Sequence, residues 1–162
     1  KQKPRPKVVL TWAPHPRALP QAVPNSFAEW MNAADVDFVI THPKGYELDP
    51  AFAGNARVEY DQMKAFEGAD FIYAKNWSCP GVTCPESYGK ILDDYHQMMH
   101  WTVDEAHMAV TDNARFMHCL PVRRGMIVSD GVIEAPTSLV IPEAANREIS
   151  ATVVIKRMLE SL

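Results

Sequence analysis

Short apolar segments alternate with helix signals along this chain, and this alternation restricts its fold more than any other feature. Five short runs have the length and composition of strands: Val8–Trp12, Val36–Thr41, Phe71–Ala74, Arg115–His118 and Leu139–Ile141. Helices are expected between and after them, at about Phe27–Ala34, Tyr60–Glu67, Thr102–Ala109 and Glu143–Leu159. This order predicts an α/β fold with a parallel sheet of about five strands and helices on both faces.

Two capping boxes mark expected helix starts. A Ser or Thr three residues before a Glu lets the two side chains satisfy free backbone N–H groups at a helix N-terminus. Ser26 and Glu29 form one such pair, and Thr102 and Glu105 form another. The last helix carries an apolar stripe that we expect to pack on the sheet or against a neighbouring domain: Ile149, Val153, Ile155 and Leu159.

The chain has 162 residues, of which 47% are hydrophobic, and a net charge of -4 at pH 7. This size fits one domain, residues 8–162, and the acidic balance argues against a nucleic-acid-binding surface. Because no apolar run approaches the ~18 residues that cross a bilayer, no membrane segment is expected. Three cysteines, an odd number, favour a reducing cytoplasm over a disulfide framework. Residues 1–7 are basic and contain prolines, which predicts a linker from a preceding N-terminal domain.

The segment from His118 to Pro121 places reactive groups directly after a predicted strand. A lone cysteine is usually a small buried hydrophobe, and a lone histidine usually has a packing role. Here an imidazole, a thiol and the guanidinium of Arg123 follow one another within six residues. Ligands of open α/β sheets bind outside the carboxyl ends of the strands, so this segment is a candidate for the rim of an active site.

Other strands of the predicted sheet also lead into cationic or imidazole side chains. His15 follows the first strand, Lys75 ends the third, and Arg147 lies near the start of the last helix. In a parallel sheet these strand ends lie at one edge, where they would meet the group around His118. A cationic cleft on an acidic chain indicates a small anionic ligand, either a carboxylate or a phosphate.

The segment His118-Cys119-Leu120-Pro121 resembles the motif of the ornithine-type branch of the transcarbamylase family, whose aspartate branch has proline at the position of Cys119. Further segments closely resemble the members that use N-succinylornithine: Thr11–Pro16, Ala74–Trp77, Val122–Arg124 and Pro142–Glu148. The resemblance covers nearly the whole chain. It implies a Rossmann-like second domain, the half that binds the amino acid, preceded by a carbamoyl-phosphate domain in a homotrimer.

The resemblance also implies a reaction and a role for each candidate residue. The carbamoyl group of carbamoyl phosphate would pass to the side-chain amine of N-succinyl-L-ornithine, giving N-succinyl-L-citrulline and phosphate in arginine biosynthesis. No metal or other cofactor is implied, and this chain alone would be inactive without the first domain. The implied roles are acyl-ornithine binding by His15, Lys75 and Arg123, carbamoyl-phosphate binding by Cys119 and Arg147, and catalytic orientation by His118, Cys119 and Leu120.

The acyl group is indicated by one position. Ile127 stands where relatives that use N-acetylornithine have a functional lysine, which favours the succinyl substrate. N-acetylornithine and unmodified ornithine stay open as alternative substrates.

Two alternatives belong to other functional classes. Cys79, Cys84, His96 and His100 have a spacing close to that of a Cys2His2 zinc site, with two thiols followed by two histidines one helical turn apart. This segment lacks the basic helix of a nucleic-acid-reading finger, so a longer loop with two inert thiols competes with that interpretation. The domain could also bind an acidic metabolite without catalysis, although the combination around His118 argues for an enzyme.

Overall fold

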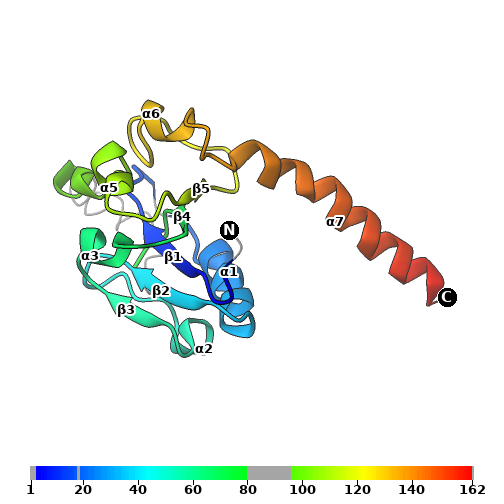
Figure 1. Ribbon diagram of the computed structural model, residues 1–162. Helices are drawn as coiled ribbons and strands as arrows, with labels where there is room; N and C mark the ends of the chain where they lie inside the picture. Colours follow the sequence, from blue (N-terminus) through cyan, green and yellow to red (C-terminus); the bar gives the residue numbers. More distant parts are fainter. Residues whose placement is uncertain (1–2, 18, 80–95, 162) are drawn as a thin grey trace.

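The computed structural model describes residues 3–17, 19–79 and 96–161, and in this part of the chain five strands form one parallel sheet (Figure 1). The strands lie in the order β3-β2-β1-β4-β5, and every paired neighbour is parallel. This confirms the predicted α/β architecture. The strand bounds are β1 (Lys7–Trp12), β2 (Asp37–Thr41), β3 (Arg57–Glu59), β4 (Phe71–Lys75) and β5 (Arg115–Met117).

Helices cover both faces of the sheet, as predicted. The helix bounds are α1 (Ala22–Ala33), α2 (Pro50–Ala53), α3 (Gln62–Phe66), the 3-10 turn η2 (Met99–Trp101), α5 (Glu105–Ala109), α6 (Asp130–Ile133) and α7 (Val140–Glu160). Along β1, Val8 and Leu10 pack into the cluster that contains residues of α1, whereas Val9 packs into the cluster that contains residues of α3 and α6. Both faces of the central strand are therefore buried, as is usual for a parallel sheet.

The fifth strand is not the one that the sequence predicts. Leu139–Ile141 is not a strand, because Leu139 is the N-cap of α7 and the next residues are helical. The preceding residue, Ser138, makes an isolated parallel bridge to Phe116 of β5. Pro142 fits the first turn of a helix, where its missing N–H costs no hydrogen bond. The actual fifth strand, β3, is short, polar and mostly exposed, so it lacks the apolar pattern that marks a strand.

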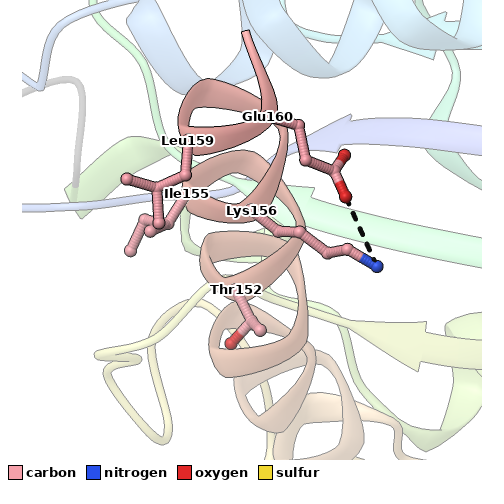
Figure 2. A pocket seen from close by; sticks show the side chains of 5 residues that line it. All are labelled: Thr152, Ile155, Lys156, Leu159 and Glu160. Atoms are coloured by element: carbon pink, nitrogen blue, oxygen red, sulfur yellow. Dashed lines mark ion pairs between the residues drawn. The ribbon is translucent and has the colours of Figure 1, made fainter. Parts of the chain in front are cut away.

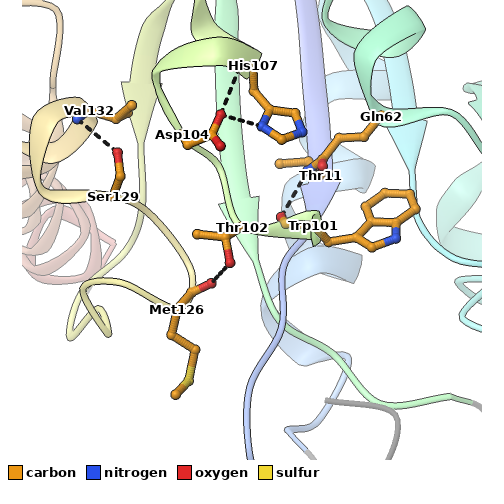
Figure 3. A network of polar contacts seen from close by, with 9 residues as sticks. All are labelled: Thr11, Gln62, Trp101, Thr102, Asp104, His107, Met126, Ser129 and Val132. Atoms are coloured by element: carbon orange, nitrogen blue, oxygen red, sulfur yellow. Dashed lines mark hydrogen bonds and ion pairs between the residues drawn. The ribbon is translucent and has the colours of Figure 1, made fainter. Parts of the chain in front are cut away.

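Two helix starts also differ from the capping-box prediction. Helix α1 begins four residues before Ser26, and its N-cap, Gln21, makes no capping hydrogen bond with its side chain. Helix α5 is capped by Asp104, whose carboxylate accepts the backbone N–H of His107 at 3.0 Å. Thr102 instead donates its hydroxyl to the carbonyl of Met126 at 2.7 Å (Figure 3).

A buried polar network holds the end of β1. Figure 3 shows Gln62 of α3 between Thr11 and Trp101. The Gln62 amide donates to Thr11 Oγ1 at 2.8 Å and to the Trp101 carbonyl at 3.1 Å. Thr11, Gln62 and Trp101 are all buried. Buried hydrogen bonds of this kind fix one arrangement, so the strand end beside the candidate site has a defined position.

Helix α7 extends away from the body of the domain (Figure 1). Its apolar stripe does not pack on the sheet as one of the two expectations had it, because the four stripe residues are 48% to 65% exposed. Figure 2 shows a shallow surface depression whose lining side chains all come from α7, with Lys156 and Glu160 as an ion pair at 3.8 Å. In the described part of the chain, no helix combines the length and apolarity that crossing a membrane requires.

Candidate active site

The candidate site lies where the sheet changes its winding direction. Strands β2 and β3 lie on one side of β1, and β4 and β5 lie on the other, so the connections diverge between β1 and β4. Trp12 and Lys75 are register partners at the ends of these two strands. Beyond them, Ala13 donates its N–H to the Lys75 carbonyl at 3.1 Å, and Asn76 donates its amide to the Ala13 carbonyl at 2.7 Å. Such switch points are the usual ligand sites of open α/β sheets.

His15 and Arg123 meet across this edge, although they are 108 residues apart in sequence. Arg123 Nε donates to His15 Nε2 at 3.1 Å, so Nε2 carries no proton. The proton of the neutral ring is then on Nδ1, which donates to the Arg17 carbonyl at 3.1 Å. Burial lowers the pKa of His15, and the charges of Arg123 and Lys75 lower it further, while the contact with Arg17 opposes them. Of the three residues predicted to bind an acyl-ornithine, Arg123 and Lys75 therefore both lie close enough to His15 to act on its ring.

His118 is a buried, neutral histidine, and one of its ring nitrogens has no hydrogen-bond partner among the described residues. Its side chain follows β5 and the residue is 1% exposed. Burial, assisted by the charge of Lys75, lowers the pKa of His118 to about 4. Nδ1 accepts the backbone N–H of Leu120 at 3.0 Å, which places the proton on Nε2. Among the described residues Nε2 has no hydrogen-bond partner. A buried donor without a partner is costly, and an acceptor on a bound ligand would satisfy it.

The shifted pKa of His118 makes acid sensitivity an expected property of the folded protein. Between pH ~6.5, where an unfolded histidine titrates, and pH ~4, the unfolded chain binds more protons than the folded one. The stability that neutral His118 contributes should therefore be fully present above pH ~6.5 and should be lost as the pH falls toward 4. The lowered pKa of His15 acts in the same direction. Urea midpoints of the full-length protein across this range, for wild type and His118→Gln, measure it. A variant with the wild-type pH slope would contradict the assignment.

Cys119, Leu120 and Arg147 line a common pocket of ≈ 570 Å³. Leu120 has a φ of +47°, a left-handed conformation that is rare for a bulky residue, and the Leu120–Pro121 peptide bond is cis. Non-glycine residues in this left-handed region of φ cluster at functional sites. Arg147 is exposed on α7 and contributes its side chain to the same pocket. The structure thus brings the residues predicted to bind carbamoyl phosphate to one place.

Two residues near the site were not singled out from the sequence. Tyr73 on β4 is buried, and burial, with the nearby Cys119 side chain acting in the same direction, raises the pKa of Tyr73, so the phenol stays protonated. Glu143 Oε2 accepts the backbone N–H of His118 at 3.0 Å, and burial raises the pKa of Glu143. The only sequence signal for Tyr73 is its place two residues before Lys75 on the same side of a strand.

The zinc alternative remains a prediction. Cys84 lies outside the described residues, whereas Cys79, His96 and His100 lie within them. In residues 3–17, 19–79 and 96–161, no three His, Cys, Asp or Glu side chains gather closely enough to hold a metal ion. His100 makes a local contact, from Nδ1 to the carbonyl of Gln97 at 3.1 Å.

Known proteins of one family match this chain over most of its length. A sequence model of the aspartate/ornithine carbamoyltransferase Asp/Orn-binding domain matches residues 20–158. N-succinylornithine carbamoyltransferase of Bacteroides fragilis (strain 638R) is 72% identical over 162 residues, which are 100% of this chain and 49% of that protein. N-acetylornithine carbamoyltransferase of Xylella fastidiosa (strain 9a5c) is 37% identical over 153 residues, which are 87% of this chain and 45% of that protein.

Solved structures show the same similarity. The crystal structure of an N-acetyl-L-ornithine transcarbamylase superposes with a TM-score of 0.77 at 34% identity, covering 89% of this chain and 47% of that one. A variant of an N-acetyl-L-ornithine transcarbamylase, complexed with carbamyl phosphate and N-succinyl-L-norvaline, superposes with a TM-score of 0.74 over the same shares of the two chains. The chain therefore spans about half the length of the relatives and structures that it matches.

Proposed function

Because this chain belongs to the aspartate/ornithine carbamoyltransferase family, we propose that it is the amino-acid-binding part of an N-succinylornithine carbamoyltransferase. The protein would transfer the carbamoyl group of carbamoyl phosphate to the side-chain amine of N-succinyl-L-ornithine, in arginine biosynthesis. The observation that carries the proposal is the meeting of His15, Lys75 and Arg123 beside the unpartnered Nε2–H of His118.

The residue types suit the two charged ends of N-succinylornithine. Arg123 uses Nε for His15, which engages one of its five N–H donors, and Lys75 provides a second cation nearby. Two cations match the two carboxylates of a succinylated amino acid, whereas N-acetylornithine has only one. Ile127 is buried in the core and donates its N–H to the Arg123 carbonyl at 3.0 Å, so no cationic side chain stands at that position.

The types of the other residues support carbamoyl transfer. Arg147 binds the phosphate, and the Nε2–H of His118 donates to the carbamoyl oxygen, where negative charge develops as the amine attacks. The Cys119 thiol and the Leu120 carbonyl orient the neutral amine. The new bond joins the amine nitrogen to the carbamoyl carbon, the carbon–oxygen bond to phosphate breaks, and the proton lost by the nitrogen leaves with the phosphate. Holding two substrates together provides much of the acceleration.

A turnover assay of the full-length protein tests this function. With carbamoyl phosphate present, kcat/KM for N-succinylornithine should exceed that for N-acetylornithine or ornithine by roughly 10- to 100-fold, the value of one additional charge-assisted contact. A preference for N-acetylornithine or for unmodified ornithine would overturn the substrate assignment. Absence of any citrulline-type product would instead support a non-catalytic metabolite-binding domain.

The proposal extends to the partners of this domain. A preceding domain, joined through residues 1–7, would bind the phosphate of carbamoyl phosphate and cover the exposed apolar stripe of α7. We place the protein in the cytoplasm as a homotrimer, by family analogy, and expect this chain by itself to be inactive. Sedimentation equilibrium of the full-length protein tests the trimer, and a monomer mass would contradict it.

A further inference from the structure

We propose that Glu143 is a positioning residue that holds the strand end carrying His118 and Cys119 in register with the helix carrying Arg147. This inference rests on the proposed function and deepens it by adding a residue that acts through the backbone of the site. Its carboxylate Oε2 lies 3.0 Å from the backbone nitrogen of His118.

The Glu143 carboxylate takes the place of a backbone carbonyl that a further strand would provide at the edge of the sheet. Phe116 of β5 donates its N–H to the Thr137 carbonyl at 3.2 Å, and its carbonyl accepts the N–H of Leu139 at 2.8 Å. In a parallel ladder the next donor on this edge is two residues further along, at His118. The neighbouring segment cannot supply the acceptor, because it becomes helical at Val140. The carboxylate from the first turn of α7 accepts the bond in its place.

This contact is a main anchor of α7 at the site. Within Val140–Glu160, Val140 is the only buried residue, so few apolar contacts hold the helix to the domain. Arg147 follows Glu143 by four residues, about one helical turn, and both side chains line the pocket that contains Cys119 and Leu120. Fixing Glu143 against the backbone of His118 therefore fixes where Arg147 stands relative to Cys119.

The contribution of Glu143 is geometric rather than electrostatic. A carboxylate that lines a pocket for a phosphate repels that anion, so its charge works against binding. The favourable contribution of Glu143 comes from the length of its side chain, which lets a carboxylate oxygen accept the His118 N–H. Glutamine has the same length and keeps an acceptor oxygen, whereas Ala lacks the acceptor and Asp is shorter by one methylene. These three substitutions separate position from charge.

Kinetics of the full-length protein test the role. Glu143→Ala and Glu143→Asp are expected to raise the KM for carbamoyl phosphate by about 10-fold and to change the KM for N-succinylornithine by less than about 2-fold. Glu143→Gln should stay within about 2-fold of wild type on both. Glu148→Ala, an exposed carboxylate on the same helix, is the matched control. An unchanged carbamoyl-phosphate KM in Glu143→Ala, or a Glu143→Gln variant as impaired as Glu143→Ala, would overturn the proposal.

Hydrogen exchange gives a readout that does not depend on activity. The His118 amide should be protected in wild type and Glu143→Gln, and should exchange at least about 10-fold faster in Glu143→Asp and Glu143→Ala. Equal protection in all variants would remove the contact on which the inference stands. If the wild-type protein forms no citrulline-type product, the proposed function fails, while the exchange rates still decide whether Glu143 holds this strand end. If Glu143→Ala does not fold, the comparison of Gln with Asp decides.

Discussion

A His118→Ala variant of the full-length protein is expected to have a kcat lower than wild type by about 10²- to 10³-fold, with much smaller changes in both KM values. The reason is the Nε2–H group, which is buried and has no partner among the described residues. A donor held in place before the reaction stabilises charge on the carbamoyl oxygen without any reorganisation. Steady-state kinetics measure the effect, and His100→Ala, an exposed histidine with a local backbone contact, is the control.

The protonation state of His118 sharpens this prediction. Because its pKa is lowered to about 4, His118 stays neutral throughout the range in which the enzyme would be assayed. Any acidic limb of kcat between pH ~5.5 and 7 should thus belong to another group and persist in His118→Gln. A loss below about 10-fold in His118→Ala would show that this donor does not serve the chemical step.

The second large effect is expected in two arginine variants, each of which should weaken the binding of a different substrate. Arg123→Ala should weaken N-succinylornithine binding by about 10- to 100-fold and leave carbamoyl-phosphate binding within about 2-fold of wild type. Arg147→Ala should do the reverse. The two guanidiniums lie in different places. Arg123 contacts His15, which lies on the loop after β1. Arg147, on α7, lines the pocket that also contains Cys119.

Calorimetric titration of each ligand into the full-length variants measures this pair. Arg57→Ala, an exposed arginine on the edge strand β3, controls for loss of surface charge. If each substitution weakened both ligands equally, the assignment of Arg123 and Arg147 to different substrates would be wrong.

Much of the fold could be predicted because the central strands are apolar on both faces. Val8–Trp12 and Phe71–Ala74 carry this pattern, and both are strands at nearly the predicted bounds. The edge strand Arg57–Glu59 has no such pattern, since its side chains are largely exposed. Leu139–Ile141 has a strand-like composition, but its length also fits the start of a helix, and only tertiary contacts with β5 decide between the two.

The candidate site shows a similar limit. Residues with distinctive chemistry, such as His118 and Arg147, could be proposed from the sequence, and the parallel sheet explains why they lie at the same edge. The contacts that orient them could not be predicted. Tyr73 looks like an ordinary strand aromatic, and Glu143 acts on a backbone N–H that becomes available only because its neighbour leaves the sheet.

The projecting helix α7 has a practical consequence for handling this chain by itself. Its last three turns expose the apolar side chains of Val154, Ile155, Met158 and Leu159 next to charged side chains. Exposed apolar surface of this kind promotes non-specific association. Produced by itself, this chain should adhere to hydrophobic matrices and aggregate at high concentration. Expression together with the preceding domain proposed above would cover these side chains and give better material for crystallography.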